Sequence, residues 1–103
     1  MALFKDWDDL NENGNLGDWC FFTGSDKNTY IAFRYPHQDT IGYSPEMMKD
    51  YRGEISHIPV SQGQKQTKFW LWNGSMESPT ISPSINIIGQ WHGYIRNGKL
   101  ETV

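Results

Sequence analysis

Hydrophobic and polar residues alternate over two stretches near the end of the chain, which is the pattern of β-strands with one buried face. The first stretch covers residues 81–88 and the second covers residues 91–96. Their apolar sets are Ile85 and Ile87 on the first stretch, and Trp91, Gly93 and Ile95 on the second. Their polar sets are Ser84 and Asn86 on the first, and His92, Tyr94 and Arg96 on the second. The pattern predicts two strands that place both apolar sets against one core.

The loop between these strands decides which residues face each other, because strand side chains alternate with a period of two. A three-residue loop at 88–90 lets both apolar sets meet the core, so Trp91 is expected to be buried and His92 exposed. This register pairs Ile87 with Trp91, Ile85 with Gly93, Asn86 with His92 and Ser84 with Tyr94. Ser84 and His92 then become diagonal neighbours on the polar face, about 7 Å apart.

The rest of the chain predicts further short strands and one or two short helices. The strands are expected at residues 19–23, 29–35, 54–60, 69–72 and 99–103. Pro59 removes a backbone donor from the strand at 54–60, which predicts that this strand lies at a sheet edge. Helices are expected at residues 3–11, ended by Asn13-Gly14, and from Ser44-Pro45-Glu46 onward. These elements predict a mostly β, α+β fold: a small antiparallel sandwich or open barrel with one or two short helices.

Length and charge narrow the class of protein. The 103 residues have the length of a single domain, 1–103. Nine basic residues face twelve acidic ones, and no stretch is strongly basic, which disfavours a nucleic-acid binder. No apolar run approaches the roughly 20 residues of a membrane span, and the chain does not begin like a signal peptide. These features predict no membrane partner and a cytoplasmic or virion location.

Metal binding has little support in the sequence. Cys20 is the only cysteine, and the histidines are His37, His57 and His92. This set falls short of a four-ligand site, so we predict no tightly bound zinc and no cofactor. A metal held by His57, His92 and a carboxylate is the alternative, although no ligand spacing indicates it. Cys20 is expected to be a small buried apolar residue.

Ser84 and His92 are the residues that carry candidate chemistry. A serine becomes a nucleophile when a base accepts its proton, and histidine is the usual base. Asn86 and Tyr94 would support such a site from the same face, and the backbone N–H groups after Pro83 would offer an oxyanion site. The alternative interpretation is a hydroxyl that shapes a Ser-Pro-Ser bend beside a solvated histidine.

The aromatic residues around Trp70 and Trp72 offer a different function. These two tryptophans share one face of their strand, while Phe69 and Leu71 share the other. Both faces cannot easily be core in a two-layer domain. Either a helix covers one face, or some tryptophan is exposed for a partner, a sugar or a second subunit. Burial in the core or against a subunit is the expected account.

Three motifs suggest a family. They are Trp70-Leu71-Trp72-Asn73-Gly74, then Pro79-Thr80-Ile81-Ser82-Pro83-Ser84-Ile85, then Trp91-His92-Gly93-Tyr94-Ile95-Arg96-Asn97-Gly98. In this order, over roughly residues 54–100, they resemble a family of small phage and bacterial proteins of unassigned function. Phage copies, including those of marine cyanobacterial viruses, look most similar. Bacterial relatives occur in ubiquitination-like operons, where the resemblance implies a serine peptidase that processes a ubiquitin-like protein.

The resemblance points to Ser84 as nucleophile and His92 as base. Many relatives carry a Cys-x-x-Cys-like knuckle after the second strand, whereas this chain has no cysteine at residues 36–42. No residue clearly orients His92, the candidates being Asn86, Asp18 and Glu77. The sequence therefore predicts an accessory protein of phage type that acts as a Ser/His hydrolase on a peptide or ester bond. The alternative is a non-catalytic binding or virion assembly module with a protein or peptide partner, or a homo-oligomer. The role of residues 36–53 stays open.

Overall fold

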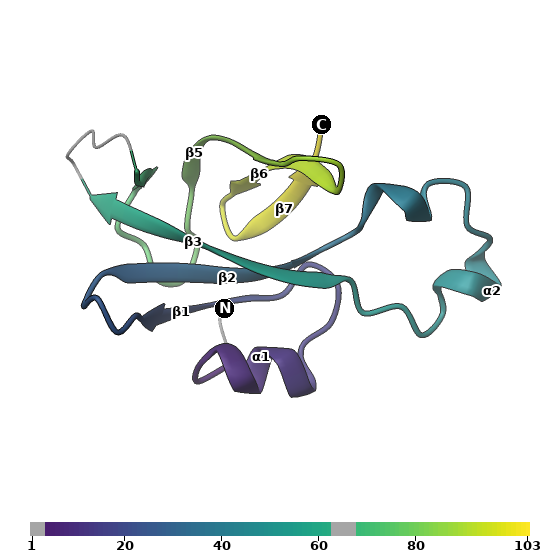
Figure 1. Cartoon of the computed structure of the whole chain (residues 1–103), viewed down its shortest axis with the longest axis horizontal. Helices are drawn as coiled ribbons and strands as arrows, with labels where there is room; N and C mark the ends of the chain where they lie inside the picture. Colours follow the sequence, from purple (N-terminus) through teal and green to yellow (C-terminus); the bar gives the residue numbers. More distant parts are fainter. Residues whose placement is uncertain (1–3, 63–67) are drawn as a thin grey trace.

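The computed structural model describes residues 4–62 and 68–103. Seven strands form one curled sheet in the order β1-β2-β3-β4-β5-β6-β7, with β5, β6 and β7 folded over β2 and β3 (Figure 1). The strands are β1 Trp19–Thr23, β2 Thr29–Tyr35, β3 Glu54–Gln62, β4 Trp70–Trp72, β5 Ile81–Ile87, β6 Trp91–Arg96 and β7 Lys99–Thr102. The short helices are α1 Trp7–Asn13, the 3₁₀ helix η1 Gln38–Thr40, and α2 Pro45–Met48. The predicted mostly β open barrel with short helices is confirmed.

The strand β3 differs from the prediction. It is not an edge strand, because it pairs with β2 on one side and with β4 on the other. Pro59 is tolerated because it is the last residue paired with β2, while the pairing with β4 begins at Val60. The two neighbours thus meet β3 along different halves of its length. The β3–β4 pair is also parallel, whereas every other strand pair of the described residues is antiparallel.

The main core lies between the two halves of the curled sheet. Residues from both halves bury their side chains there: Trp19, Ile31, Phe33, Tyr35, Ile58, Val60, Ile81, Ile85, Trp91 and Ile95. Trp70 and Trp72 pack against this core, whereas Leu71 on the opposite face is 46% exposed. Packing on the core therefore accounts for the two tryptophans, and this finding favours core burial over an exposed binding face.

Helix α1 covers a smaller cluster on the outer face of β1 and β2. Leu10, Cys20 and Ala32 are completely buried there. The helix begins later than predicted, because the Asp6 side chain accepts a hydrogen bond from the backbone N–H of Asp9 and so caps the first turn. The predicted end at Gly14 is confirmed, while residues 1–3 of the predicted helix lie outside the described residues. Ser44 caps α2, as predicted. No helix of the described part is long and apolar enough to cross a membrane.

A buried arginine fastens α1 to the sheet. Arg34 on β2 is only 6% exposed, and its guanidinium donates to the carbonyl oxygens of Leu10, Asn11, Arg52 and Gly53 over 2.6–3.2 Å. Two of these carbonyls belong to the C-terminal half of α1, where a positive charge complements the helix dipole. Burial is the main reason that the pKa of Arg34 is lowered.

We expect Arg34→Met to lower the free energy of unfolding by about 2–3 kcal/mol, because hydrogen bonds from a charged group are lost and buried carbonyls stay unsatisfied. Urea unfolding followed by tryptophan fluorescence measures the change. Arg52→Met is the matched control, since Arg52 also donates to the end of α1 but is less buried. An equal loss in both variants would contradict the special role of the buried Arg34.

Candidate functional site

The hairpin of β5 and β6 has the predicted register next to its turn. Ile87 pairs with Trp91, Asn86 with His92, and Ile85 with Gly93. The loop at 88–90 has the predicted length, and its Gln90 N–H donates to the carbonyl of Ile87 over 2.8 Å. Trp91 is 2% exposed, whereas His92 is exposed, so the predicted division between core and surface is confirmed.

A bulge interrupts β5 at the candidate nucleophile. Ile81 pairs with Ile95 and Ile85 pairs with Gly93, so β5 advances four residues while β6 advances two. Ser84 is therefore not paired with Tyr94 as predicted; the segment 82–84 lies opposite Tyr94 alone. Because two residues are inserted, the side-chain alternation is kept, and Ile81 and Ile85 on either side of the bulge both face the core at 1% exposure. The bulge leaves Ser82 paired with Leu71 of β4, and bulges often lie beside active sites.

Ser84 and His92 meet across the hairpin. The Nε2 atom of His92 lies 2.9 Å from the Oγ atom of Ser84, within the range of a nucleophile and its base. Asn86 and His92 are directly opposite, and the bulge carries the Ser84 hydroxyl to the imidazole. The carbonyl of Ser84 accepts a hydrogen bond from the Trp70 indole N–H at 3.4 Å. We call this arrangement the Ser84–His92 pair.

The supporting residues are less closely involved. Asn86 is the cross-strand neighbour of His92, but no hydrogen bond joins their side chains. The ring of Tyr94 lies 3.8 Å below the guanidinium of Arg96. Asp18 instead accepts a hydrogen bond from the backbone N–H of Asn15. Within residues 4–62 and 68–103, no side chain bonds to Nδ1 of His92, so the carboxylate of a three-residue arrangement is not present there.

The packing around Gly93 explains why the residue between His92 and Tyr94 is a glycine. It is buried, and a Cβ atom there would overlap the indole of Trp91 and the carbonyl oxygen of Glu101. The indole thus lies against the backbone of its own strand, and its N–H donates to Thr102 Oγ1 at 2.9 Å. This contact holds β6 and β7 together beneath His92.

Sequence reasoning missed the segment 36–41, which lies beside His92. A cavity of about 290 Å³ opens between this segment and the neighbouring parts of β6 and the C-terminal end of the chain. It is lined by Pro36, His37, Gln38, Thr40, Ile41, Trp91, His92, Thr102 and Val103. No local signal could have revealed it, because the segment is attached to the hairpin turn by long-range hydrogen bonds.

Cys20 is not part of this site. It is completely buried under α1, and burial raises the pKa of its thiol to about 11, with a smaller contribution from the carboxylates of Asp6 and Asp9. The prediction of a buried apolar cysteine is confirmed. In the described part of the chain, no group of three or more His, Cys, Asp or Glu side chains is placed to hold a metal ion. The expectation that zinc and cofactors are not bound stays a prediction.

We expect Cys20 to resist a disulfide reagent such as dithionitrobenzoate at pH 8 while the protein is folded, because only the thiolate reacts. Unfolding in guanidinium should make it react at the rate of a free thiol. The same pKa predicts lower stability from about pH 9 to 11, where the unfolded thiol ionises and the folded one does not. Rapid labelling of the native protein at pH 8 would contradict the burial of this thiol.

The comparisons with known proteins bear on the half of the chain that contains the Ser84–His92 pair. The model of the bacterial ubiquitination-like system serine protease family (BubE) matches residues 51–103, which include β3 to β7. No curated protein and no solved structure matches the chain. The resemblance to proteins of ubiquitination-like operons is thereby confirmed, while the phage origin stays a prediction. Because more than half of its residues match, the chain belongs to the bacterial ubiquitination-like system serine protease family.

Proposed function

We propose that this protein is a serine hydrolase of the peptidase type, with Ser84 as nucleophile and His92 as general base. The contact of 2.9 Å between Ser84 Oγ and His92 Nε2 is the observation that carries the proposal. The family match supports the same reaction class, because the matched residues include both members of the pair. Ser84 is half-buried and His92 is exposed, so substrate can reach both.

The chemistry follows from the two atoms in contact. Ser84 Oγ attacks the carbonyl carbon of the scissile bond, and its proton passes to His92 Nε2. The bond from carbon to the leaving nitrogen or oxygen then breaks, and His92 donates its proton to that leaving atom. A water molecule, deprotonated by His92, attacks the acyl ester and releases the acid and free Ser84. The imidazole therefore alternates between base and acid and is regenerated at the end of the cycle. The reaction consumes only the substrate and water.

The bulge supplies a donor for the negative charge that develops on the carbonyl oxygen. Ser84 has no paired residue on β6, and Pro83 before it contributes no N–H group. The backbone N–H of Ser84 is the donor that we assign to this oxygen, since serine hydrolases commonly use the N–H of the nucleophile itself. His92 acts without a carboxylate among the described residues, which predicts a slower enzyme than one with a full triad.

The substrate we propose is a polypeptide of a ubiquitination-like system, as the name of the matched family suggests. This choice fits the acidic chain, which has formal net charge −3, whereas nucleic-acid binders gain affinity from an excess of basic residues. We place the reaction in the cytoplasm, where a ubiquitination-like system would operate.

A fluorophosphonate probe tests the proposal directly, because it reacts with serines that a base has activated. We expect a single covalent adduct, mapped to Ser84 by peptide mass spectrometry. Labelling should disappear in Ser84→Ala and in His92→Ala. Ser82→Ala is the matched control, since Ser82 is exposed in the same bulge and has no histidine contact. An adduct that persists in Ser84→Ala, or no adduct on the folded protein, would overturn the hydrolase.

A binding module is the second candidate, and it is favoured by exposed apolar side chains. Ile88 at the hairpin turn and Ile41 in the neighbouring segment are 88% and 81% exposed. Trp70 and Trp72, the residues first considered for partner binding, pack on the core instead. Protein capture through Ile88 that persists in Ser84→Ala and is lost in Ile88→Asp would favour this module, whereas capture that Ile88→Asp leaves unchanged would exclude it.

A further inference from the structure

Because a cavity lies beside His92, the two sides of the candidate site differ. His92 lines this cavity of about 290 Å³, whereas Ser84 is not among its lining residues. The volume is at the lower end of ligand pockets, which is suitable for a side chain rather than a large cofactor. The cavity therefore extends from the base and away from the nucleophile.

The chemistry of amide hydrolysis determines which part of the substrate lies on the His92 side of the site. After Ser84 Oγ has bonded to the carbonyl carbon, the proton on His92 must reach the leaving nitrogen as the carbon–nitrogen bond breaks. The leaving nitrogen, and the residue that carries it, must then lie next to the imidazole. The chain that follows the scissile bond consequently passes on the His92 side, where the cavity opens.

The lining of the cavity indicates what it accepts. Ile41, Val103 and Trp91 supply apolar surface, while the polar side chains of the lining are uncharged or imidazole. None of its lining residues is Asp, Glu, Lys or Arg. An acidic side chain would lose its hydration there without gaining a cationic side chain as partner, which is costly. An apolar side chain would be favoured.

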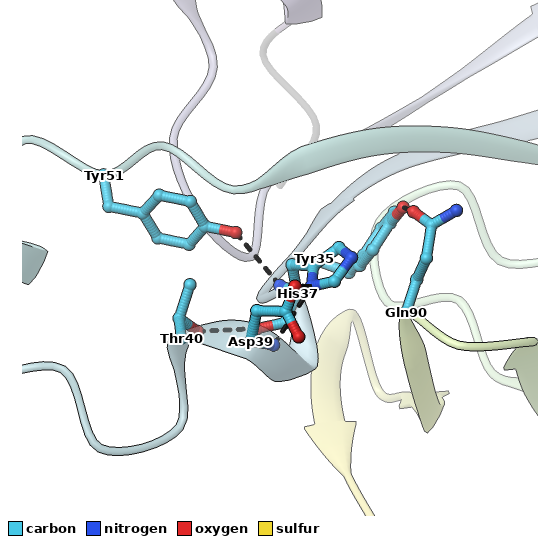
Figure 2. Close-up of polar contacts among 6 residues, drawn as sticks. All are labelled: Tyr35, His37, Asp39, Thr40, Tyr51 and Gln90. Carbon is cyan, nitrogen blue, oxygen red and sulfur yellow. Dashed lines mark hydrogen bonds and ion pairs between the residues drawn. The ribbon is translucent and has the colours of Figure 1, made fainter.

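The wall formed by the segment 36–41 is held in place by hydrogen bonds (Figure 2). The His37 N–H donates to the Tyr51 hydroxyl at 3.0 Å, and Thr40 Oγ1 donates to the His37 carbonyl at 2.7 Å. The Gln38 N–H donates to the carbonyl of Gln90 at 2.6 Å, which joins the segment to the hairpin turn. The Tyr35 hydroxyl donates to the side chain of the same Gln90. A wall fixed in this way discriminates between occupants because it does not need to rearrange.

His37 lines the cavity and has a ring nitrogen that acts as a hydrogen-bond donor. Its Nδ1 accepts the N–H of Asp39 at 3.0 Å, so the proton of the neutral imidazole is on Nε2. A donor beside an apolar wall suits a peptide, whose backbone carbonyl accepts while its side chain fills the apolar part. The cavity thus combines one donor with one apolar surface.

We propose that this cavity is the subsite for the residue immediately after the scissile bond, and that it selects an apolar side chain. The proposal rests on the function proposed above and adds the specificity on the leaving-group side. Ile41 is its selecting residue, and His37 positions the backbone of the leaving chain.

Partitioning of the acyl-enzyme tests this subsite. A p-nitrophenyl ester acylates Ser84, and added amino-acid amides then compete with water for the acyl group from the leaving-group side. We expect leucinamide to capture it at least about tenfold better than glycinamide or aspartic acid α-amide, which keeps its side-chain carboxylate. Ile41→Asp should remove the preference for leucinamide. Met76→Asp is the matched control, because Met76 is also exposed but does not line the cavity.

A second measurement separates this inference from the hydrolase itself. Leucinamide is titrated into Ser84→Ala while amide resonances are followed by NMR, and shifts are expected at 36–41 and at the Trp91 indole N–H. Acylation with equal capture of all three amides would overturn the subsite and leave the hydrolase standing. Shifts without any acylation of the native protein would leave the cavity as a binding site and overturn the hydrolase. No preference and no shifts would overturn the subsite outright.

Discussion

Ser84→Ala is expected to reduce ester and peptide hydrolysis by at least about 10³-fold, because the nucleophile and the acyl-enzyme are both lost. His92→Ala should reduce the rate by about 10²–10⁴-fold, the contribution of a positioned general base. The double variant should be no slower than Ser84→Ala, since residues that act as one unit are not additive. Initial rates with a p-nitrophenyl ester and with a peptide substrate measure these effects.

A second histidine, outside the Ser84–His92 pair, provides the control for these variants. His57 on β3 is exposed and lies against the rings of Phe22 and Tyr30, away from the pair. His57→Ala should therefore leave the rate within about twofold of the native protein. Circular dichroism of all variants checks that the fold is kept. Equal activity of native and Ser84→Ala proteins would show that the 2.9 Å contact is structural rather than catalytic.

Trp91→Ala is expected to lower the free energy of unfolding by about 3–5 kcal/mol, as truncation of a buried aromatic residue does. The indole packs against Phe33 and Tyr35, with ring centroids 5.9 and 5.8 Å apart, and bonds to Thr102. Its loss leaves a void in the core and a free hydroxyl on β7. Because His92 follows directly, we expect fluorophosphonate labelling of Ser84 to weaken before the protein unfolds.

Chemical denaturation followed by far-ultraviolet circular dichroism measures this stability, so that the missing tryptophan does not change the signal. Ile88→Ala in the adjacent turn should change stability by less than about 0.5 kcal/mol, because Ile88 is exposed. Trp91→Phe should fall between the two, since it keeps a ring and loses the bond to Thr102. A loss below about 1 kcal/mol in Trp91→Ala would contradict the core position of this side chain.

The sequence predicts the hairpin well because alternation is a local signal. Ile87 and Trp91 can both reach the core in one register only, and that register brings Ser84 toward His92. The contact is closer than the diagonal spacing predicted, because the bulge at 82–84 moves the hydroxyl. An insertion of two residues keeps the same faces buried, so the hydrophobic pattern carries no trace of it.

The parts that escaped prediction depend on contacts between distant segments. Arg34 lies on the face opposite Phe33, as alternation predicts, but its carbonyl partners belong to α1 and to residues 52 and 53. The segment 36–41 has no periodic pattern, and its place beside His92 follows from its bonds to Gln90 and Tyr51. Pro59 suggested an edge strand because proline has no backbone N–H to donate to a neighbouring strand. In the structure Pro59 lies where the pairing of β3 changes from β2 to β4, so β3 can still have a neighbour on each side.

The core described above has a consequence for truncated versions of the protein. The family match begins at residue 51, yet Phe33 and Tyr35, which lie against Trp91, come from β2. A fragment with residues 51–103 would retain both reactive side chains and lose the aromatic platform under their hairpin. The strand β2 therefore acts as an internal scaffold for the hairpin, because two of its aromatic rings support Trp91.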